Sequence, residues 1–161
     1  EIWGLCFACA LLRSEVVKRT GPLDPDFFAE WDDVDFATRA RWLGYKFQLV
    51  PAAKVLHHRS PTSQRDSRAK FSRLRRNRVL TFVKCLPRRT AMRLVIYRVQ
   101  HDVGMIFQFL RRGEFGAVAR AWWEVLRLTP RMLARRREWK RQARLSDRQM
   151  RIAIKKATGN A

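Results

Sequence analysis

The residues best suited to chemistry lie in one acidic and aromatic segment, residues 27 to 35, which reads Phe-Phe-Ala-Glu-Trp-Asp-Asp-Val-Asp. An alcohol is a poor nucleophile until a base such as a carboxylate takes its proton. If the alcohol attacks a sugar that is attached to a nucleotide, a nucleoside diphosphate departs, and its charge needs a divalent cation. Hard oxygen ligands with at most one histidine suit Mg²⁺ or Mn²⁺. Asp33 is therefore a candidate general base, and His57, further along the chain, a candidate metal ligand. This chemistry would transfer a sugar from a nucleotide donor to a hydroxyl.

Both features also have a structural explanation that involves no catalysis. Asp32, Asp33 and Asp35 fall in the first turn of a predicted helix, where the helix dipole favours negative charge. His57 and His58 could be ordinary half-buried histidines at a strand end. Composition leaves these explanations open, and only the joint pattern of acids, aromatics and histidine favours a catalytic site.

The first part of the chain, residues 1 to 62, alternates between strand and helix patterns, which is typical of an α/β domain. A glycine, Gly44, follows the longer helix pattern as its C-terminal cap, and Pro51 separates the last two strands. The predicted elements are a strand over 2 to 12, helices over 14 to 18 and 32 to 43, and strands over 46 to 50 and 53 to 58.

The second part, residues 63 to 161, is predicted to form basic helices, and the boundary falls near residue 62 in a Ser-Pro-Thr-Ser segment. Prolines and a glycine divide it into helices over about 63 to 86, 89 to 110, 114 to 128 and 131 to 157. Each mixes arginines with apolar residues at helical spacing. Such helices lie on anionic membrane surfaces or bind polyanions.

The two parts differ sharply in charge. Residues 1 to 58 carry seven Lys or Arg against eight Asp or Glu, a net charge of −1, whereas residues 59 to 161 carry 28 against six, a net charge of +22. The two parts must therefore face different partners. No apolar stretch approaches the length of a transmembrane helix, and the three cysteines fit reduced core thiols of a cytoplasmic protein.

Several spaced segments give the chain a resemblance to a known family. From about residue 3 to residue 87 it resembles the acceptor half of family 2 glycosyltransferases, in particular bacterial rhamnosyltransferase-like and galactofuranosyltransferase-like members. The family's Gly-Gly-Phe-Asp is Gly21-Pro22-Leu23-Asp24 here. The segments that carry the resemblance are Gly21 to Phe36, Arg39 to Tyr45, Val50 to Ala53 and Val55 to Ser60.

The resemblance implies a site and a fold. It implies the C-terminal part of an α/β GT-A (Rossmann-like) domain and an inverting mechanism, in which Asp33 is the base and Asp32 a supporting acid. It implies that His57 completes the site of a Mg²⁺ or Mn²⁺ ion. Trp31, with Phe28 nearby, would stack against the acceptor sugar through its flat apolar face.

The family's nucleotide-binding strands and its Asp-x-Asp motif precede anything that matches here. We therefore expect the chain to be the C-terminal portion of a longer protein, with the N-terminal nucleotide-binding half absent and little activity of its own. The implied partners are a nucleotide-sugar donor and a glycan or lipid-linked glycan acceptor of the cell envelope. The charge and amphipathic pattern of the second part predicts a peripheral location, on the anionic cytoplasmic face of a bacterial plasma membrane.

The competing hypothesis is a basic helical module that binds nucleic acid or another polyanion without catalysis, because the charge of the second part would attract phosphates strongly. Few aromatic residues there are placed to stack on bases, and no zinc-finger, RRM or KH pattern is present. Nucleic acid is therefore the less favoured partner.

Overall fold

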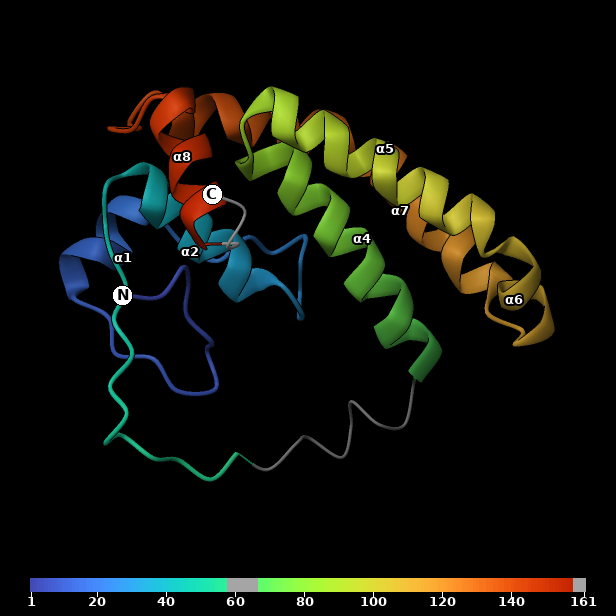
Figure 1. Cartoon of the computed structure of the whole chain (residues 1–161), viewed down its shortest axis with the longest axis horizontal. Helices are drawn as coiled ribbons and strands as arrows, with labels where there is room; N and C mark the ends of the chain where they lie inside the picture. The colour runs from blue at the N-terminus through green and yellow to red at the C-terminus, as the bar shows by residue number, and fades with distance from the viewer. Residues whose placement is uncertain (58–66, 158–161) are drawn as a thin grey trace.

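The structure is a computed structural model that describes residues 1–57 and 67–157, and its regular structure is helical (Figure 1). A long arm of α4, α5 and α7 extends from a smaller region that holds α1, α2 and α8. None of the described helices is both long and apolar enough to cross a bilayer. The helices are α1 (Ser14–Thr20), α2 (Asp32–Trp42), α4 (Ser67–Cys85), α5 (Arg88–Gly104), α6 (Ile106–Arg111), α7 (Phe115–Lys140) and α8 (Asp147–Ala157).

The predicted α/β, Rossmann-like GT-A fold is wrong, because the described residues form no strand and no sheet. One isolated antiparallel bridge joins Ile2 to Phe47, with 3.0 Å between the Ile2 nitrogen and the Phe47 oxygen. A strand needs a continuous row of such bonds, and a turn from Cys6 to Cys9 interrupts the first apolar run. The later runs leave side chains such as Leu49 and Leu56 exposed, so they have no layer to pack on. His58, at the end of the last predicted strand, lies outside the described residues.

The helices predicted in the first part are confirmed by α1 and α2. Gly44 follows α2 with a φ of 87°, the left-handed conformation in which glycine commonly ends helices. Arg41 fixes the segment before α1 onto α2, since its guanidinium donates hydrogen bonds to the carbonyl oxygens of Ile2 and Trp3.

The expected helix end before Pro130 is wrong, because α7 continues through this proline. An interior proline removes one backbone hydrogen bond and usually kinks or ends a helix. Here Val125, Leu128 and Met132, on both sides of Pro130, are all buried in the core that α7 shares with α4. Packing along the whole length of α7 therefore outweighs the local cost.

Two apolar clusters organise the molecule. The smaller cluster packs Val16, Phe36 and Ala40 of α1 and α2 against the N-terminal segment. The larger lies between α4 and α7, and it includes Phe27, which is fully buried although it belongs to the loop between α1 and α2. Phe27 therefore anchors the loop before α2 to the helical arm.

Candidate functional site

The loop that leads into α2 has an unusual backbone. Phe28, Glu30 and Trp31 have φ values of 59°, 68° and 68°, in the left-handed region that non-glycine residues seldom adopt. Each such residue costs about 1–3 kcal/mol and persists only when the surrounding structure holds it, most often at functional sites. Trp31 is also the N-cap residue of α2 and gives it no side-chain cap. This start of α2 is not built for helix stability alone.

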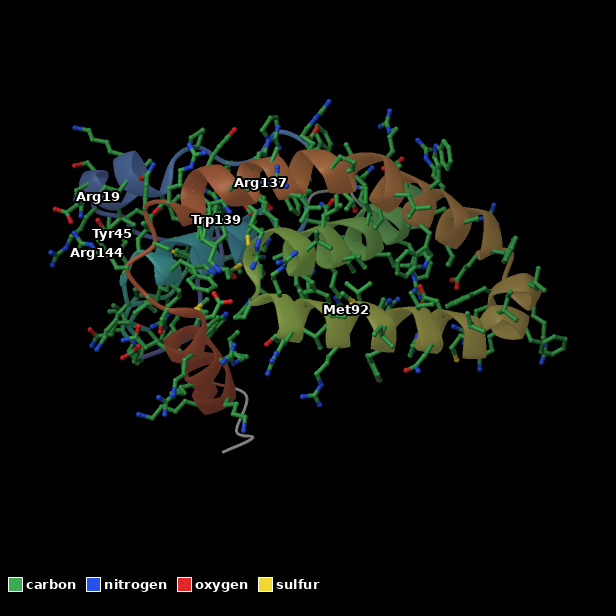
Figure 2. The ribbon with its side chains drawn as sticks, turned by 90° about the horizontal axis from the view of Figure 1, so that it is seen from above. Arg19, Tyr45, Met92, Arg137, Trp139 and Arg144 are labelled. Carbon is green, nitrogen blue, oxygen red and sulfur yellow. The ribbon has the colours of Figure 1, made fainter. Side chains whose placement is uncertain are left out.

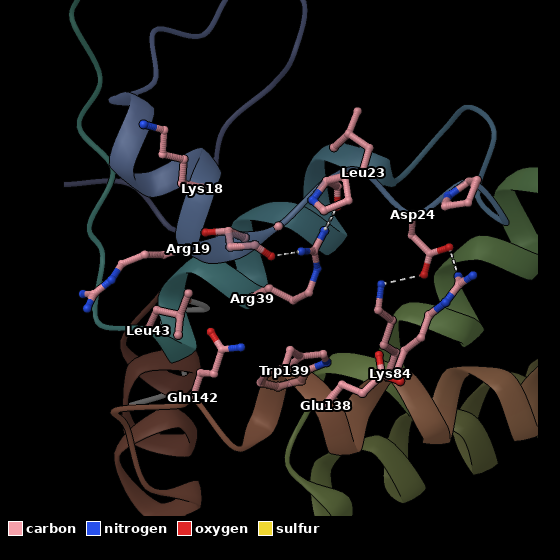
Figure 3. Close-up of a pocket in the computed structure, with 15 residues that line it drawn as sticks. Lys18, Arg19, Leu23, Asp24, Arg39, Leu43, Lys84, Glu138, Trp139 and Gln142 are labelled. Atoms are coloured by element: carbon pink, nitrogen blue, oxygen red, sulfur yellow. Dashed lines mark hydrogen bonds and ion pairs between the residues drawn. The ribbon is translucent and has the colours of Figure 1, made fainter.

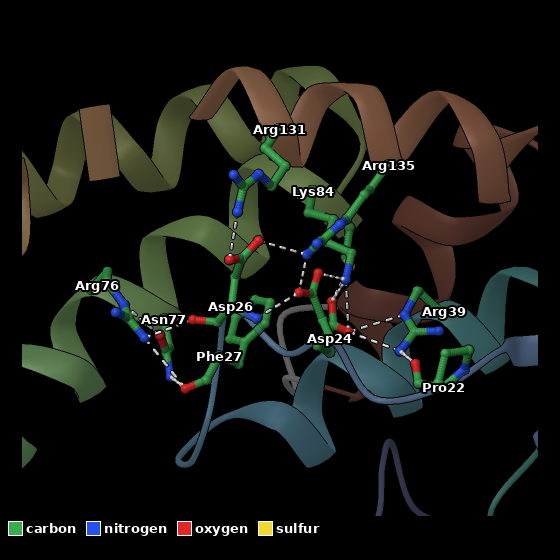
Figure 4. Close-up of polar contacts among 12 residues, drawn as sticks. Pro22, Asp24, Asp26, Phe27, Arg39, Arg76, Asn77, Lys84, Arg131 and Arg135 are labelled. Atoms are coloured by element: carbon green, nitrogen blue, oxygen red, sulfur yellow. Dashed lines mark hydrogen bonds and ion pairs between the residues drawn. The ribbon is translucent and has the colours of Figure 1, made fainter. Parts of the chain in front are cut away.

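Helix α4 holds this loop in place through two neighbouring residues, Arg76 and Asn77. The buried Asn77 amide donates hydrogen bonds to the carbonyl oxygens of Phe27, Ala29 and Glu30, at 3.0, 2.8 and 2.6 Å. The Arg76 guanidinium donates to the carbonyl oxygens of Asp26 and Phe27 (Figure 4). These hydrogen bonds satisfy the carbonyl groups that the strained loop turns toward α4. We call Arg76 and Asn77 the loop clamp.

Replacing Asn77 by alanine should destabilise the loop, because buried carbonyl groups lose their donor. We expect the free energy of unfolding to fall by about 1–3 kcal/mol, and amide hydrogen exchange to become faster from residue 27 to residue 31. Urea denaturation and exchange measured by mass spectrometry check both effects. The control is Gln100→Ala, at an exposed position of α5, which should change neither. Unaltered exchange in Asn77→Ala would contradict the loop clamp.

A buried network of charges joins the loop, α2 and the helical arm (Figure 4). The Lys84 ammonium lies 2.8 Å from Oδ2 of Asp24 and 2.8 Å from Oδ1 of Asp35, and all three side chains are at most 3% exposed. Asp35 also accepts a hydrogen bond from Arg39 at 3.0 Å. On the other side, Arg135 of α7 pairs with Asp24. Lys84 therefore bridges two carboxylates from separate parts of the fold, and each carboxylate also has an arginine partner of its own.

The acidic cluster of the sequence thus divides between two environments. Asp35 points into the charge network, whereas Asp32 and Asp33 are only partly buried. Partial burial raises the pKa of the Asp33 carboxyl, and the Asp32 carboxylate adds to the rise, while hydrogen bonds from backbone groups oppose it. One of these comes from the Val34 N–H, at 2.7 Å. A carboxylate with a raised pKa is the stronger base once it is ionised.

The two predicted acceptor-binding aromatics differ in their surroundings. The Phe28 side chain is 81% exposed and close to Arg73, whose guanidinium carbon lies 5.9 Å from the ring centroid. Trp31 is half-buried against α4, with the Arg78 guanidinium carbon 4.8 Å from its ring centroid and the edge-on Phe82 ring at 6.2 Å. Phe28 therefore offers a free apolar face, whereas Arg78 covers one face of Trp31.

The structure does not bring the predicted metal ligand together with other ligands. His57 is exposed in an irregular segment, and no group of three or more His, Cys, Asp or Glu side chains among residues 1–57 and 67–157 is placed to hold a metal ion. The described residues do not by themselves fit a metal site, so no chemical step is assigned to one here.

A cavity of about 450 Å³ lies beside the charge network, between α1, the loop, and α7 (Figure 3). It is lined by Asp24, Arg39 and Lys84 of the network, and also by Lys18 of α1 and Trp139 of α7. The predicted residues Phe28, Trp31, Asp32, Asp33 and His57, all of them described, do not line it. The cavity and the predicted catalytic carboxylate are therefore separate features of the surface.

Sequence reasoning missed the residues that position the loop, namely Arg76, Asn77 and Lys84. They lie about fifty positions from their partners, and no local pattern joins them. One signal was available, because Asn77 and Lys84 share a helix face with Leu80 and are seven residues apart, which is close to two turns. Polar residues on a core-facing helix side indicate buried polar partners.

Comparison with known proteins supports a coarse classification. Part of the chain is similar in sequence to glycosyltransferases. The relatives are N-acetylglucosaminyl-diphospho-decaprenol L-rhamnosyltransferases from two strains of Mycobacterium tuberculosis, each 34% identical over 59 residues. The match covers 37% of this chain and 19% of each relative, so the chain spans about a fifth of the length of these curated relatives. No family model and no solved structure matches the chain.

Proposed function

We propose that the chain belongs to an inverting glycosyltransferase and supplies its acceptor-binding side. The observation that carries the proposal is the strained and clamped loop, which leads directly into the first turn of α2. This turn contains Asp33, a carboxylate with a raised pKa, and the exposed Phe28 ring is close to it in sequence. The partial similarity to rhamnosyltransferases supports the same reaction class. The proposed donor is a nucleotide sugar, with rhamnose the first candidate, and the proposed acceptor is a lipid-linked glycan.

In the proposed reaction, the acceptor hydroxyl oxygen attacks the anomeric carbon of the donor. The new carbon–oxygen bond forms on one face of the sugar while the bond to the nucleoside diphosphate breaks on the other, which inverts the configuration. Asp33 takes the acceptor proton. The neighbouring Asp32 carboxylate keeps the local potential negative and therefore favours the protonated form of Asp33. Phe28 and Trp31 would hold the acceptor sugar by stacking.

A divalent metal, Mg²⁺ or Mn²⁺, with His57 as one ligand remains a prediction. Its chemistry would be to neutralise the departing diphosphate. Replacement of His57 by alanine should then raise the Mn²⁺ concentration needed for half-maximal activity, and equal metal dependence in both forms would contradict this role.

The test is donor turnover by the complete gene product. Nucleoside diphosphate release is measured with a panel of nucleotide sugars and a lipid-linked acceptor, in Mn²⁺, in Mg²⁺ and in EDTA. We expect release with one donor that depends on the acceptor. No release with any donor by a folded protein would reject the proposal and favour the polyanion-binding alternative.

A further inference from the structure

Helices α5 and α6 leave a continuous apolar stripe uncovered on the outer side of the arm. Six apolar side chains follow each other at alternating spacings of four and three residues, so the members in each of the two helices lie on one face of that helix. Each is between 40% and 64% exposed. They are Met92, Ile96, Val99, Val103, Ile106 and Leu110, and we call them the α5–α6 stripe.

The stripe continues into two hollows between α5 and α7. One, of about 340 Å³, is lined by Val99, Val103 and Ile106 on one side and by Phe115 and Trp122 of α7 on the other. The second, of about 550 Å³, lies farther along the arm, between Met92 of α5 and Leu133 and Arg137 of α7. Figure 2 labels Met92 and Arg137 on the two helices that border it. Exposed apolar surface therefore extends along much of the arm.

The segment that carries the apolar stripe, residues 88 to 112, is rich in arginine and has no exposed acid. From residue 88 to residue 112 the chain has six arginines and one acid, Asp102, and Asp102 is buried and paired with Arg75 and Arg98. The exposed arginines lie near the two ends of the stripe. Arg88, Arg89 and Arg93 lie around its first residue, Met92, and Arg111 and Arg112 follow its last.

The position of two of these arginines is informative. Arg88 and Arg89 are the first two residues of α5, and the first turn of this helix contains no acid. The helix dipole favours acids there and disfavours cations. Helix stability therefore does not explain the pair.

We propose that the α5–α6 stripe docks on an anionic lipid surface, with its apolar side chains in the headgroup and acyl boundary and its terminal arginines on lipid phosphates. The combination of an apolar stripe with basic ends suits this interface. A nucleic acid would use the arginines but leave the apolar side chains in water. A second copy of the chain would bring like charges together. The proposal is independent of the transfer reaction.

The test is co-sedimentation of the complete protein with vesicles of phosphatidylcholine, alone and with added phosphatidylglycerol. We expect binding to the mixed vesicles only, and binding should weaken with added salt. The double variant Ile96→Asp/Val103→Asp should bind at least about tenfold more weakly, since charged groups must then enter the apolar boundary. Leu11→Asp is the matched control, because Leu11 is fully exposed and lies before α1, outside the two helices of the stripe, and it should bind like the unaltered protein.

A second variant, Arg88→Glu/Arg89→Glu, tests the charge contribution without risk to the fold, because acids stabilise this end of a helix. It should lose binding to the mixed vesicles and keep its helical circular dichroism. Full binding by either double variant would overturn the proposal. Tighter binding to RNA or DNA oligonucleotides than to vesicles, or a dimer in ultracentrifugation that Ile96→Asp/Val103→Asp dissociates, would also overturn it. Nucleotide-sugar turnover is also measured in detergent, without vesicles. This measurement distinguishes a failure to bind lipid from a failure of the proposed sugar transfer.

Discussion

Replacing Asp33 by asparagine should lower kcat/KM for sugar transfer by about 100- to 10,000-fold, which is the usual contribution of a general base. The amide has nearly the shape of the carboxylate and still accepts the hydrogen bond from the Val34 N–H, so the fold should be kept. Nucleoside diphosphate release gives the rate, and thermal unfolding gives the stability of the same samples.

The pH profile distinguishes a base from a structural acid. Because the pKa of Asp33 is raised, its basic form is lost at a higher pH than that of an ordinary aspartate, whose pKa is about 4. The acid limb of kcat/KM should therefore lie above about pH 4 and disappear in Asp33→Asn. Asp32→Asn is the matched control and should retain the limb, moved to lower pH because a neighbouring negative charge is gone. Transfer at the unaltered rate in Asp33→Asn would remove this residue from the mechanism.

The largest loss of stability is expected from Lys84→Met, which keeps the length of the side chain but removes its charge. Asp24 and Asp35 then remain buried without their shared cation, and breaking a buried pair in this way costs about 3–5 kcal/mol. Urea denaturation checks the effect. Lys18→Met on α1, where the side chain is exposed, should change stability little. Equal midpoints for Lys84→Met and the unaltered protein would show that the network does not need its lysine.

The same network makes stability depend on pH. Burial alone would raise the pKa of Asp24, but the hydrogen bonds and charges of Lys84 and Arg135 outweigh burial and lower it. An acid whose pKa is lowered by folding stabilises the protein above its unfolded pKa, and this contribution is lost as the pH falls through the folded value. The unaltered protein should therefore lose stability below about pH 4, and the difference between it and Lys84→Met should shrink there.

The local features of the fold could be predicted from the sequence, and the long-range ones could not. The helix pattern over residues 32 to 43, together with Gly44, marked α2 correctly, because an amphipathic pattern and a terminal glycine are local signals. The apolar run from residue 2 to residue 12 was misleading, since apolar residues fit a strand only if other strands are present to pair with it. Pro130 failed as a helix end because its effect was weighed without the packing of α7 on α4.

The candidate site shows the same division. The sequence marked the acids at the start of α2, but it could not show that Asp35 turns inward while Asp33 stays accessible. That difference depends on Lys84, which lies 49 positions from Asp35. Likewise, the left-handed backbone at Phe28 and Trp31 could not be predicted, because neither position is a glycine or an asparagine, the residues that usually adopt this conformation. It exists because Asn77 holds the neighbouring carbonyl groups from another helix.

The loop clamp also limits how this chain can be recombined with others. A chimera that joined residues 1 to 62 to a foreign helical segment would retain every acid at the start of α2 and yet lose both donors that shape the loop. An exchange of the helical arm could preserve the loop only if the incoming segment presented an asparagine and an arginine in the register of Asn77 and Arg76. In an evolving lineage, the loop and this single turn of α4 must therefore be inherited as a unit.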